Sequence, residues 1–124
     1  MRVYARKIFP HDITHEVSVR SDVVNDFFEG RRKDIHITGR RSRFKRNVTI
    51  NSATDARFGG DFKSLLLDEG RVDVNDIVLI YKLNDSEYEL EVVKQNDVRY
   101  FGLMVLFRGK ARHAFLETEG DLLG

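Results

Sequence analysis

Hydrophobic and polar residues alternate with a period of two over several short stretches of this chain, which is the pattern of half-buried β-strands. The clearest cases are residues 16–20, Glu-Val-Ser-Val-Arg, and residues 34–38, Asp-Ile-His-Ile-Thr. Other stretches are rich in β-branched and aromatic residues, and Pro10 is expected to keep the first strand out of the centre of a sheet. We predict strands over residues 2–9, 16–20, 34–38, 44–50, 77–83, 88–93 and 100–107, with a possible last strand over residues 111–116.

Two further stretches have the spacing of short helices. Within residues 21–30, a Ser-Asp pair that can cap a helix precedes the apolar pattern Val-Val-x-x-Phe-Phe, and a glycine follows it. Residues 59–70 begin with a diglycine and a capping Asp61, continue with an apolar stripe at helical spacing, and end in a glycine. Because closing a sheet of many short strands removes its exposed edges, the sequence predicts a mainly β fold, a seven- or eight-stranded open pseudobarrel with two short plug helices.

The length and composition are those of one small domain. A chain of 124 residues with 41% hydrophobic residues can bury a modest core, which we place in residues 1–116, and the acidic residues 117–124 are expected to form a tail or the start of a linker. The absence of cysteine excludes disulfides, thiolate zinc sites and a cysteine nucleophile. No apolar run approaches the roughly 20 residues of a membrane-spanning helix, and no signal-peptide core is evident, so we expect a cytoplasmic protein with no membrane partner.

The net charge of +1 conceals an uneven distribution along the chain. Residues 1–60 hold 13 Lys/Arg and 7 Asp/Glu, a balance of +6, whereas residues 61–124 hold 8 and 13, a balance of −5. Within residues 31–50, eight basic residues stand against a single acidic one, Asp34. This asymmetry favours a surface that faces a polyanion, although an ordinary solvated basic turn has the same composition.

None of the groups that commonly carry metal binding or catalysis has suitable spacing. His11 and His15 are four residues apart, but Pro10 and the polar residues around it argue against the helix that would align them. Glu91 and Lys94 would point to opposite faces of a strand, which does not fit a nuclease centre. The diglycine lacks the lysine of a phosphate-binding loop. We therefore predict no metal, no cofactor and no catalytic residue within this chain.

A glycine-started segment and the order of the predicted elements carry a family resemblance. Residues 58–66, Phe-Gly-Gly-Asp-Phe-Lys-Ser-Leu-Leu, are followed by residues 74–80, Val-Asn-Asp-Ile-Val-Leu-Ile. A polar arm follows the first predicted strand, and another follows the fourth. Over residues 1–95 this arrangement resembles the DNA-binding pseudobarrel, which plant transcription factors carry as the B-three domain and EcoRII-type restriction endonucleases carry as their DNA-recognition domain. The chain has no tryptophan and has Asn75 where the family usually has glycine, which favours the bacterial restriction branch.

The resemblance implies a sequence-specific double-stranded DNA-binding domain that grips the major groove with two arms, near residues 7–15 and 51–57. It also implies that the chain is the target-recognition module of a bacterial restriction endonuclease, whose catalytic domain or subunit lies outside it. The arms have side chains suited to base edges, such as Asn51 for adenine and Arg57 for guanine. The expected base-contacting residues are Lys7, His11, Asp12, Thr14, His15, Asn51, Ser52, Thr54, Asp55 and Arg57. The expected phosphate-contacting residues are Arg6, Arg20, Arg31, Arg32, Lys33, Arg40, Arg41, Arg43, Lys45 and Arg46.

Two other functions stay open on the sequence. A module that senses modified or flipped bases needs an aromatic-lined pocket, for which Phe9, Phe44 and Phe58 are candidates. A β-barrel that binds protein or RNA would use the acidic second half of the chain as its face. Affinity for modified and plain versions of one duplex separates the first alternative from plain sequence recognition, and neutralising the arginine-rich block tests the second.

Overall fold

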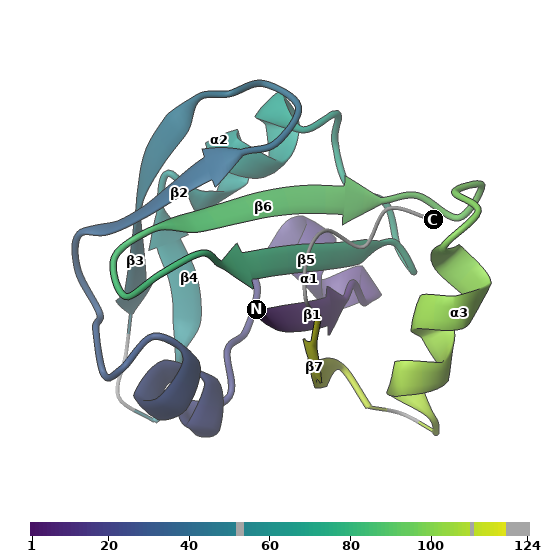
Figure 1. The fold of residues 1–124 in the computed structure, drawn as a ribbon, viewed down its shortest axis with the longest axis horizontal. Coiled ribbons are helices and arrows are strands. Elements are labelled where there is room, and N and C mark those ends of the chain that lie inside the picture. Colours follow the sequence, from purple (N-terminus) through teal and green to yellow (C-terminus); the bar gives the residue numbers. More distant parts are fainter. Residues whose placement is uncertain (52–53, 110, 119–124) are drawn as a thin grey trace.

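A curled sheet of seven strands runs through the chain (Figure 1), and the computed structural model describes residues 1–51, 54–109 and 111–118. The strands are β1 (Arg2–Lys7), β2 (Ile35–Gly39), β3 (Lys45–Asn51), β4 (Arg57–Gly60), β5 (Ile77–Lys82), β6 (Tyr88–Val93) and β7 (His113–Glu117). The helices are α1 (Pro10–Thr14), the π-helix η1 (Val23–Phe27), α2 (Phe62–Asp68), α3 (Tyr100–Met104) and the 3-10 helix η2 (Val105–Phe107). The sheet order is β4-β3-β2-β6-β5-β1-β7, and all neighbours are antiparallel except β2 and β6.

The sheet forms an open half-barrel around an apolar core, which confirms the predicted fold class. Tyr4 of β1 and Ile50 of β3 belong to one buried cluster, although β2, β6 and β5 lie between those two strands in the sheet. A flat sheet would hold these side chains far apart, so the strands must curl around the cluster. The predicted tail at residues 117–124 falls almost wholly outside the described residues, apart from Glu117 in β7 and Thr118.

The two predicted helices pack into this core. In η1 and just after it, all four residues of the predicted apolar stripe are buried, and Asp22 accepts a hydrogen bond from the Val23 N–H at 2.9 Å. Gly30 follows with a φ of +78°, a left-handed conformation that glycine adopts without strain. In α2 the apolar stripe is also buried, and Gly70 follows with a φ of +100°. Asp61, the predicted cap of α2, makes no side-chain capping bond.

Residues 100–107 are helical, so the strand predicted there is wrong. In α3 and η2, Tyr100, Leu103 and Phe107 are buried in a second cluster on the outer side of β1 and β5. Their separations of three and four residues place them on one face of a helix. β1 and β5 are consequently covered on both sides, which explains their nearly continuous apolar sequences.

Three further strand predictions need correction. Residues 16–20 form no regular strand, and their only bridge joins Ser18 to Arg57 within the described part of the chain. Arg57–Gly60 forms strand β4, where the sequence indicated the end of the second arm followed by a turn at the diglycine. β1 lies between β5 and β7 rather than at an edge, because Pro10 comes after the last paired residue, Lys7.

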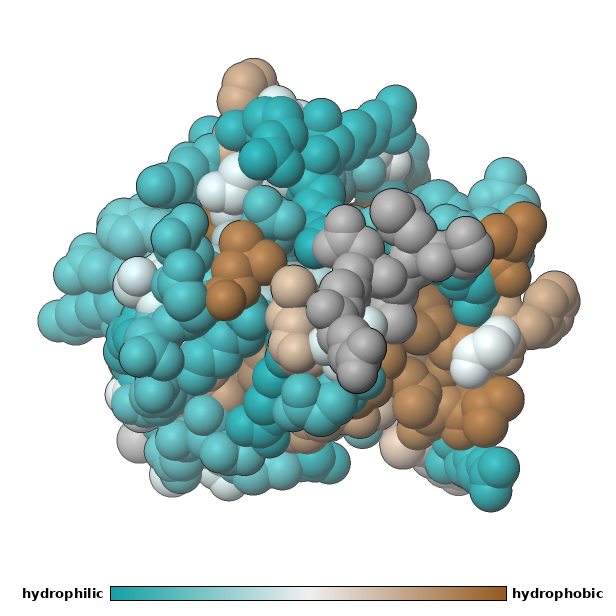
Figure 2. All heavy atoms as spheres, viewed as in Figure 1, coloured by the Kyte–Doolittle hydropathy of each residue, from teal (hydrophilic) through white to brown (hydrophobic). Residues whose placement is uncertain are grey.

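Exposed apolar side chains gather on and next to α3. Val98, Phe101 and Val105 are 91%, 80% and 55% exposed. Figure 2 shows apolar surface gathered over α3, whereas most of the same face is hydrophilic. Within the described ranges, none of the helices combines the length and the apolar character that crossing a membrane requires.

Tyr4 of β1 and His113 of β7 form a pair of side chains that makes stability depend on pH. Tyr4 Oη lies 2.6 Å from His113 Nδ1, and the two rings are stacked. Burial, with smaller contributions from Arg6 and Arg20, lowers the pKa of His113 to about 4. An unfolded histidine has a pKa of about 6.5. Between these two values the unfolded state binds more protons than the folded state, so the folded state loses stability as the pH falls.

We therefore expect the free energy of unfolding to decrease between about pH 6.5 and about pH 4, and His113→Asn to remove part of this decrease. Asparagine offers a polar atom near the position of Nδ1 and does not titrate. Urea denaturation at a series of pH values measures the slope for both proteins. His36→Asn is the matched control, because His36 is exposed and should leave the slope unchanged. Equal slopes for wild type and His113→Asn would contradict the expectation.

Candidate nucleic-acid interface

The segment after β1 is a short helix, α1, where the sequence predicts a polar connection. Pro10 lies in its first turn, where a missing N–H leaves no intrahelical bond unmade. Asp12 Oδ2 accepts a hydrogen bond from the Phe9 N–H at 2.8 Å, which stabilises the helix start. The helix stacks the rings of His11 and His15 with centroids 3.9 Å apart, so the expectation that no helix aligns them was wrong. The described residues contain no group of three or more His, Asp or Glu side chains arranged to hold a metal ion.

A buried ion pair fixes α1 to the sheet. Arg6 of β1 is 1% exposed and Asp12 of α1 is 2% exposed. Arg6 Nη2 donates to Asp12 Oδ1 at 2.8 Å and to Ser18 Oγ at 2.9 Å, and Arg6 Nε donates to Ser18 O at 3.2 Å. Neither charged side chain reaches the surface. The predicted contacts of Asp12 with a base and of Arg6 with a phosphate are therefore corrected to a role in holding the first arm.

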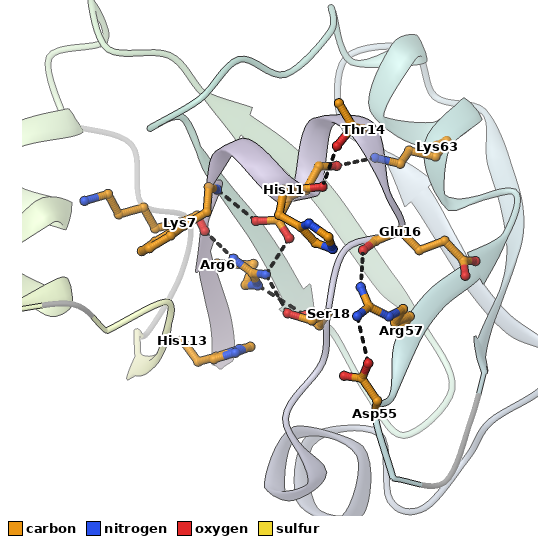
Figure 3. Close-up of polar contacts among 12 residues, drawn as sticks. Arg6, Lys7, His11, Thr14, Glu16, Ser18, Asp55, Arg57, Lys63 and His113 are labelled. Carbon is orange, nitrogen blue, oxygen red and sulfur yellow. Dashed lines mark hydrogen bonds and ion pairs between the residues drawn. The ribbon is translucent and has the colours of Figure 1, made fainter.

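The second arm lies beside the first because the residues after α1 pair with the start of β4. Residues 17–19 run antiparallel to residues 56–58, joined by backbone hydrogen bonds of 2.8 and 2.9 Å and by the bridge between Ser18 and Arg57. Since Arg6 also holds Ser18, one network of contacts connects both arms (Figure 3). The two segments that the sequence singled out are thus neighbours in space.

A polar cluster occupies the junction of the two arms (Figure 3). Arg57 Nη1 donates to Glu16 O at 3.1 Å, and Arg57 Nη2 donates to Asp55 Oδ2 at 2.7 Å. Asn51 Nδ2 donates to the Glu16 carboxylate at 3.3 Å. The Asn51 side chain extends over Gly59, where an added Cβ would stand 2.2 Å from Asn51 Nδ2. Glycine at this position therefore allows Asn51 its place in the cluster.

Most of the other predicted arm residues are accessible. Thr14 Oγ1 donates to His11 O at 3.3 Å and lies 2.8 Å from His15 Nδ1. All three side chains are exposed, so a ligand can reach them. The exposed predicted residues are His11, Thr14, His15, Asn51, Thr54 and Asp55, and the half-buried ones are Lys7 and Arg57. Ser52, also predicted to contact a base, lies outside the described residues.

Sequence reasoning missed three residues that the fold brings to the arms. Glu16 connects the second arm to the first, as described above. Lys63, in the first turn of α2, donates from Nζ to Asp12 O at 2.5 Å, and burial lowers the pKa of its amine against the opposing charges of Asp12 and Glu16. Arg112 lies over the ring of Phe9 at 4.3 Å. Lys63 and Arg112 come from segments distant in sequence, so no local pattern could have indicated them.

The basic block at residues 31–46 is less available than its composition suggests. Arg46 Nε donates to Asp68 at 2.7 Å, and Arg40 Nε donates to Glu89 at 3.0 Å. The Arg40 guanidinium also stacks on the ring of Tyr81 at 3.4 Å. Other members pair with acids, as in Arg31 with Glu29, Arg43 with Glu89 and, outside the block, Arg20 with Asp22. Of the remaining predicted phosphate residues, Lys33, Arg41 and Lys45 are exposed and Arg32 is half-buried.

The turn between β2 and β3 also lies away from the arms. Glu69, just after the end of α2, accepts hydrogen bonds from the N–H groups of Arg41 and Ser42 at 2.6 and 2.9 Å. α1 instead contacts the start of α2 through Lys63. The arginine-rich turn and the first arm thus contact opposite ends of α2.

A cavity of about 220 Å³ opens between α1 and α2, beside the first arm. It is lined by Asp12, Ile13, Val17, Lys63, Leu66, Leu67, Arg71 and Val72. The lining contains no aromatic residue. Chemically, the arms and this cavity offer hydrogen-bond donors and acceptors and a few positive charges, and hydrogen bonds hold the side chains of Arg57 and Lys63 in place.

The fold is similar to that of a bacterial domain whose structure has been solved. No protein-family model matches the chain, and no curated protein matches it. Among solved structures, the chain is similar to the N-terminal domain of Helicobacter pylori LlaJI.R1, with 26% sequence identity and a TM-score of 0.87. The match covers 96% of this chain and 100% of that one.

Proposed function

We propose that this chain is a sequence-specific double-stranded DNA-binding domain that grips the major groove with its two arms. The observation that carries the proposal is the pairing of residues 17–19 with residues 56–58, which makes the arms one unit. A groove about 12 Å wide admits such a unit, and base edges are read there by hydrogen bonds. The exposed polar side chains of both arms supply those bonds, and a preorganised pair of arms loses little conformational freedom on binding.

The proposed contacts follow from exposure and chemistry. Arg57 is suited to guanine N7 and O6, and Asn51 to adenine N6 and N7. His11, Thr14 and His15 are further donors or acceptors for base edges or phosphates. The phosphate contacts are assigned to cations in or beside the arms, namely Lys63, Arg112 and Lys7. Lys7 was expected from the sequence at a base edge, but it lies over the ring of Phe9, as Arg112 does. The exposed cations of the β2–β3 turn are left as secondary candidates.

The likeness to LlaJI.R1 supports a place in restriction and modification. That neighbour is a restriction-modification protein, and the matching part is its N-terminal domain. By analogy, we propose that this chain selects the DNA site and that cleavage is carried out by a domain or subunit outside it. The finer assignment, a pseudobarrel of the B-three and EcoRII type, rests on the order of the arms and of the two core helices along the chain.

A selection experiment with randomised duplexes tests the proposal. The chain is incubated with the duplex pool at two salt concentrations, and the retained duplexes are sequenced. Enrichment of one site supports sequence-specific binding, and the change in affinity with salt gives the number of phosphate contacts. Retention of duplexes with no enriched sequence, or no retention at the lower salt concentration, would overturn the proposal.

Arg57→Ala and Lys7→Ala separate base reading from phosphate contact. We expect Arg57→Ala to cost about 1–3 kcal/mol at the selected site and to relax one base position. Lys7→Ala should weaken all duplexes alike and reduce the salt slope by about 1. Arg41→Ala is the matched control for charge, because Arg41 lies in the β2–β3 turn, and we expect a smaller effect on the slope. Fluorescence anisotropy with selected and scrambled duplexes measures all three. Loss of affinity without relaxed specificity in Arg57→Ala would contradict the assigned role.

The two alternative functions find less support. A pocket for a flipped base needs aromatic walls, but the cavity beside the first arm has none, and Phe58 is buried. Phe9 is covered by Arg112 and Lys7, and Phe44 lies next to the arginine-rich turn rather than the arms. In the second half of the chain, the exposed apolar side chains of Val98, Phe101 and Val105 are the observation that favours a protein partner.

A further inference from the structure

We propose that Glu16 determines the specificity of the interface by selecting a base with an exocyclic amino group in the major groove, the N6 of adenine or the N4 of cytosine. This inference rests on the proposed DNA-binding function. It concerns a residue that the sequence did not single out and that the fold places between the two arms. Its basis is the set of contacts that Glu16 makes with both proposed base-reading side chains.

Glu16 is tied to both of those side chains at once. Its main-chain oxygen accepts from Arg57 Nη1 at 3.1 Å, and its carboxylate accepts from Asn51 Nδ2 at 3.3 Å. The side chain is half-buried, so its position is restricted while its oxygens still meet solvent. The negative charge of Glu16 also acts on the Lys63 amine. It raises the pKa of that amine, whereas burial lowers the same pKa by a larger amount. A carboxylate therefore stands at the junction where a base edge would enter.

A carboxylate at this position can only accept hydrogen bonds. It has about four lone-pair directions, and the Asn51 amide uses one of them through a bond of 3.3 Å. Phosphate oxygens, guanine O6 and N7, and thymine O4 are acceptors, so they repel it. Adenine N6 and cytosine N4 are the donors in the major groove. A desolvated charge without a partner is costly, so duplexes that lack an amino group at this position are rejected.

Glu16→Gln is the informative variant because it keeps the shape of the side chain. The carboxamide oxygen of the variant can still accept from Asn51, whereas the negative charge is lost and a donor is gained. We expect affinity for random duplexes to rise, since a repulsive charge has gone. Discrimination at one base position should fall by roughly tenfold to a hundredfold. Glu87→Gln, at the exposed β5–β6 turn, is the matched control and should leave discrimination unchanged. Thermal unfolding of each variant checks that the fold is retained.

The decisive measurement pairs this variant with deletion of the amino group from the DNA. Within the selected site, purine replaces adenine and 2-pyrimidinone replaces cytosine, one position at a time. We expect one such deletion to weaken wild type by roughly tenfold or more and to weaken Glu16→Gln much less, because a neutral carboxamide oxygen accepts the amino group more weakly than a carboxylate does. That difference is a coupling between the two groups. The position and the analogue identify whether adenine or cytosine is the partner.

The possible outcomes separate the inference from the function beneath it. If wild type selects a site but no amino-group deletion is coupled to Glu16, the specificity role is wrong and the DNA-binding function stands. If Glu16→Gln loses affinity for all duplexes alike, Glu16 only supports the arms and the inference is again wrong. If wild type selects no site, the proposed function and the inference fall together.

Discussion

Replacing Arg6 with methionine is expected to lower the free energy of unfolding by about 3–5 kcal/mol, the usual cost of breaking a buried ion pair from one side. The variant leaves the Asp12 carboxylate buried without its charged partner and removes the donors to Ser18. Methionine fills much of the volume of the arginine stem, so the expected loss comes from charge and hydrogen bonding rather than from an empty cavity. Such a loss is a large fraction of the roughly 5–15 kcal/mol that stabilises a typical domain.

Urea denaturation measures the expected loss, and Arg20→Met is the matched control. Arg20 also pairs with an aspartate, Asp22, but both side chains are about half exposed. Exposed ion pairs contribute roughly 0–1 kcal/mol, so the control should unfold almost as wild type does. Equal losses in the two variants would show that burial of the Arg6–Asp12 pair confers no special stability.

A double-mutant cycle refines this result. Asp12→Leu alone leaves the Arg6 guanidinium buried without a carboxylate, and it removes the bond from the Phe9 N–H. In the Arg6→Met/Asp12→Leu protein neither buried charge is left, so its loss should be well below the sum of the two single losses. Hydrogen exchange at the amides of α1 is the second measurement. In Arg6→Met we expect the exchange of the α1 amides to become faster, relative to wild type, by more than that of the β5 amides, because the pair holds the first arm to the sheet.

The fold could be predicted from sequence at most segments where one periodicity dominated, although the alternating residues 16–20 form a single bridge rather than a strand. Residues 34–38 and 44–50 alternate clearly because one face of β2 and β3 is buried, and both strands were predicted. Residues 100–107 misled because Phe101 and Val105 are apolar although they are exposed. Because apolar residues lie on both faces of this helix, the sequence resembles that of a strand whose two faces are both buried. The spacing of Tyr100, Leu103 and Phe107 was the helical signal that the overall hydropathy concealed.

The candidate site was predictable in its parts but not in its connections. The polarity of the two arms and the chemistry of Asn51 and Arg57 are visible in the sequence. The burial of Arg6 with Asp12 is not, because six residues separate them and only the start of α1 brings them together. The proline-started helix did have a signal, a proline at a first turn with an aspartate two residues later. Counting basic residues within residues 31–46 overestimated the positive charge of that surface. Acidic partners from other segments of the chain, such as Asp68 for Arg46 and Glu89 for Arg40, pair with these arginines.

Phe27→Ala is expected to destabilise the protein by about 3–5 kcal/mol, as large-to-small changes of buried phenylalanine usually do. Phe27 is fully buried in η1, and its ring lies 5.0 Å from that of Phe28, 5.8 Å from that of Tyr88 and 5.9 Å from that of Tyr4. These rings come from η1 and its end, from β6 and from β1, so the cavity left by alanine is lined by elements that cannot all move inward. Thermal and urea unfolding measure the loss.

Phe101→Ala is the control for that variant, because Phe101 is 80% exposed on α3 and its truncation should change stability by no more than about 0.5 kcal/mol. Phe27→Ala and Arg6→Met should also differ in which amides lose protection from hydrogen exchange. Phe27→Ala should lower this protection across the strands that enclose the core, whereas Arg6→Met should lower it first in α1. If Phe27→Ala exposed only the amides of η1, this helix would be a surface attachment, and the half-barrel would close around its core without it.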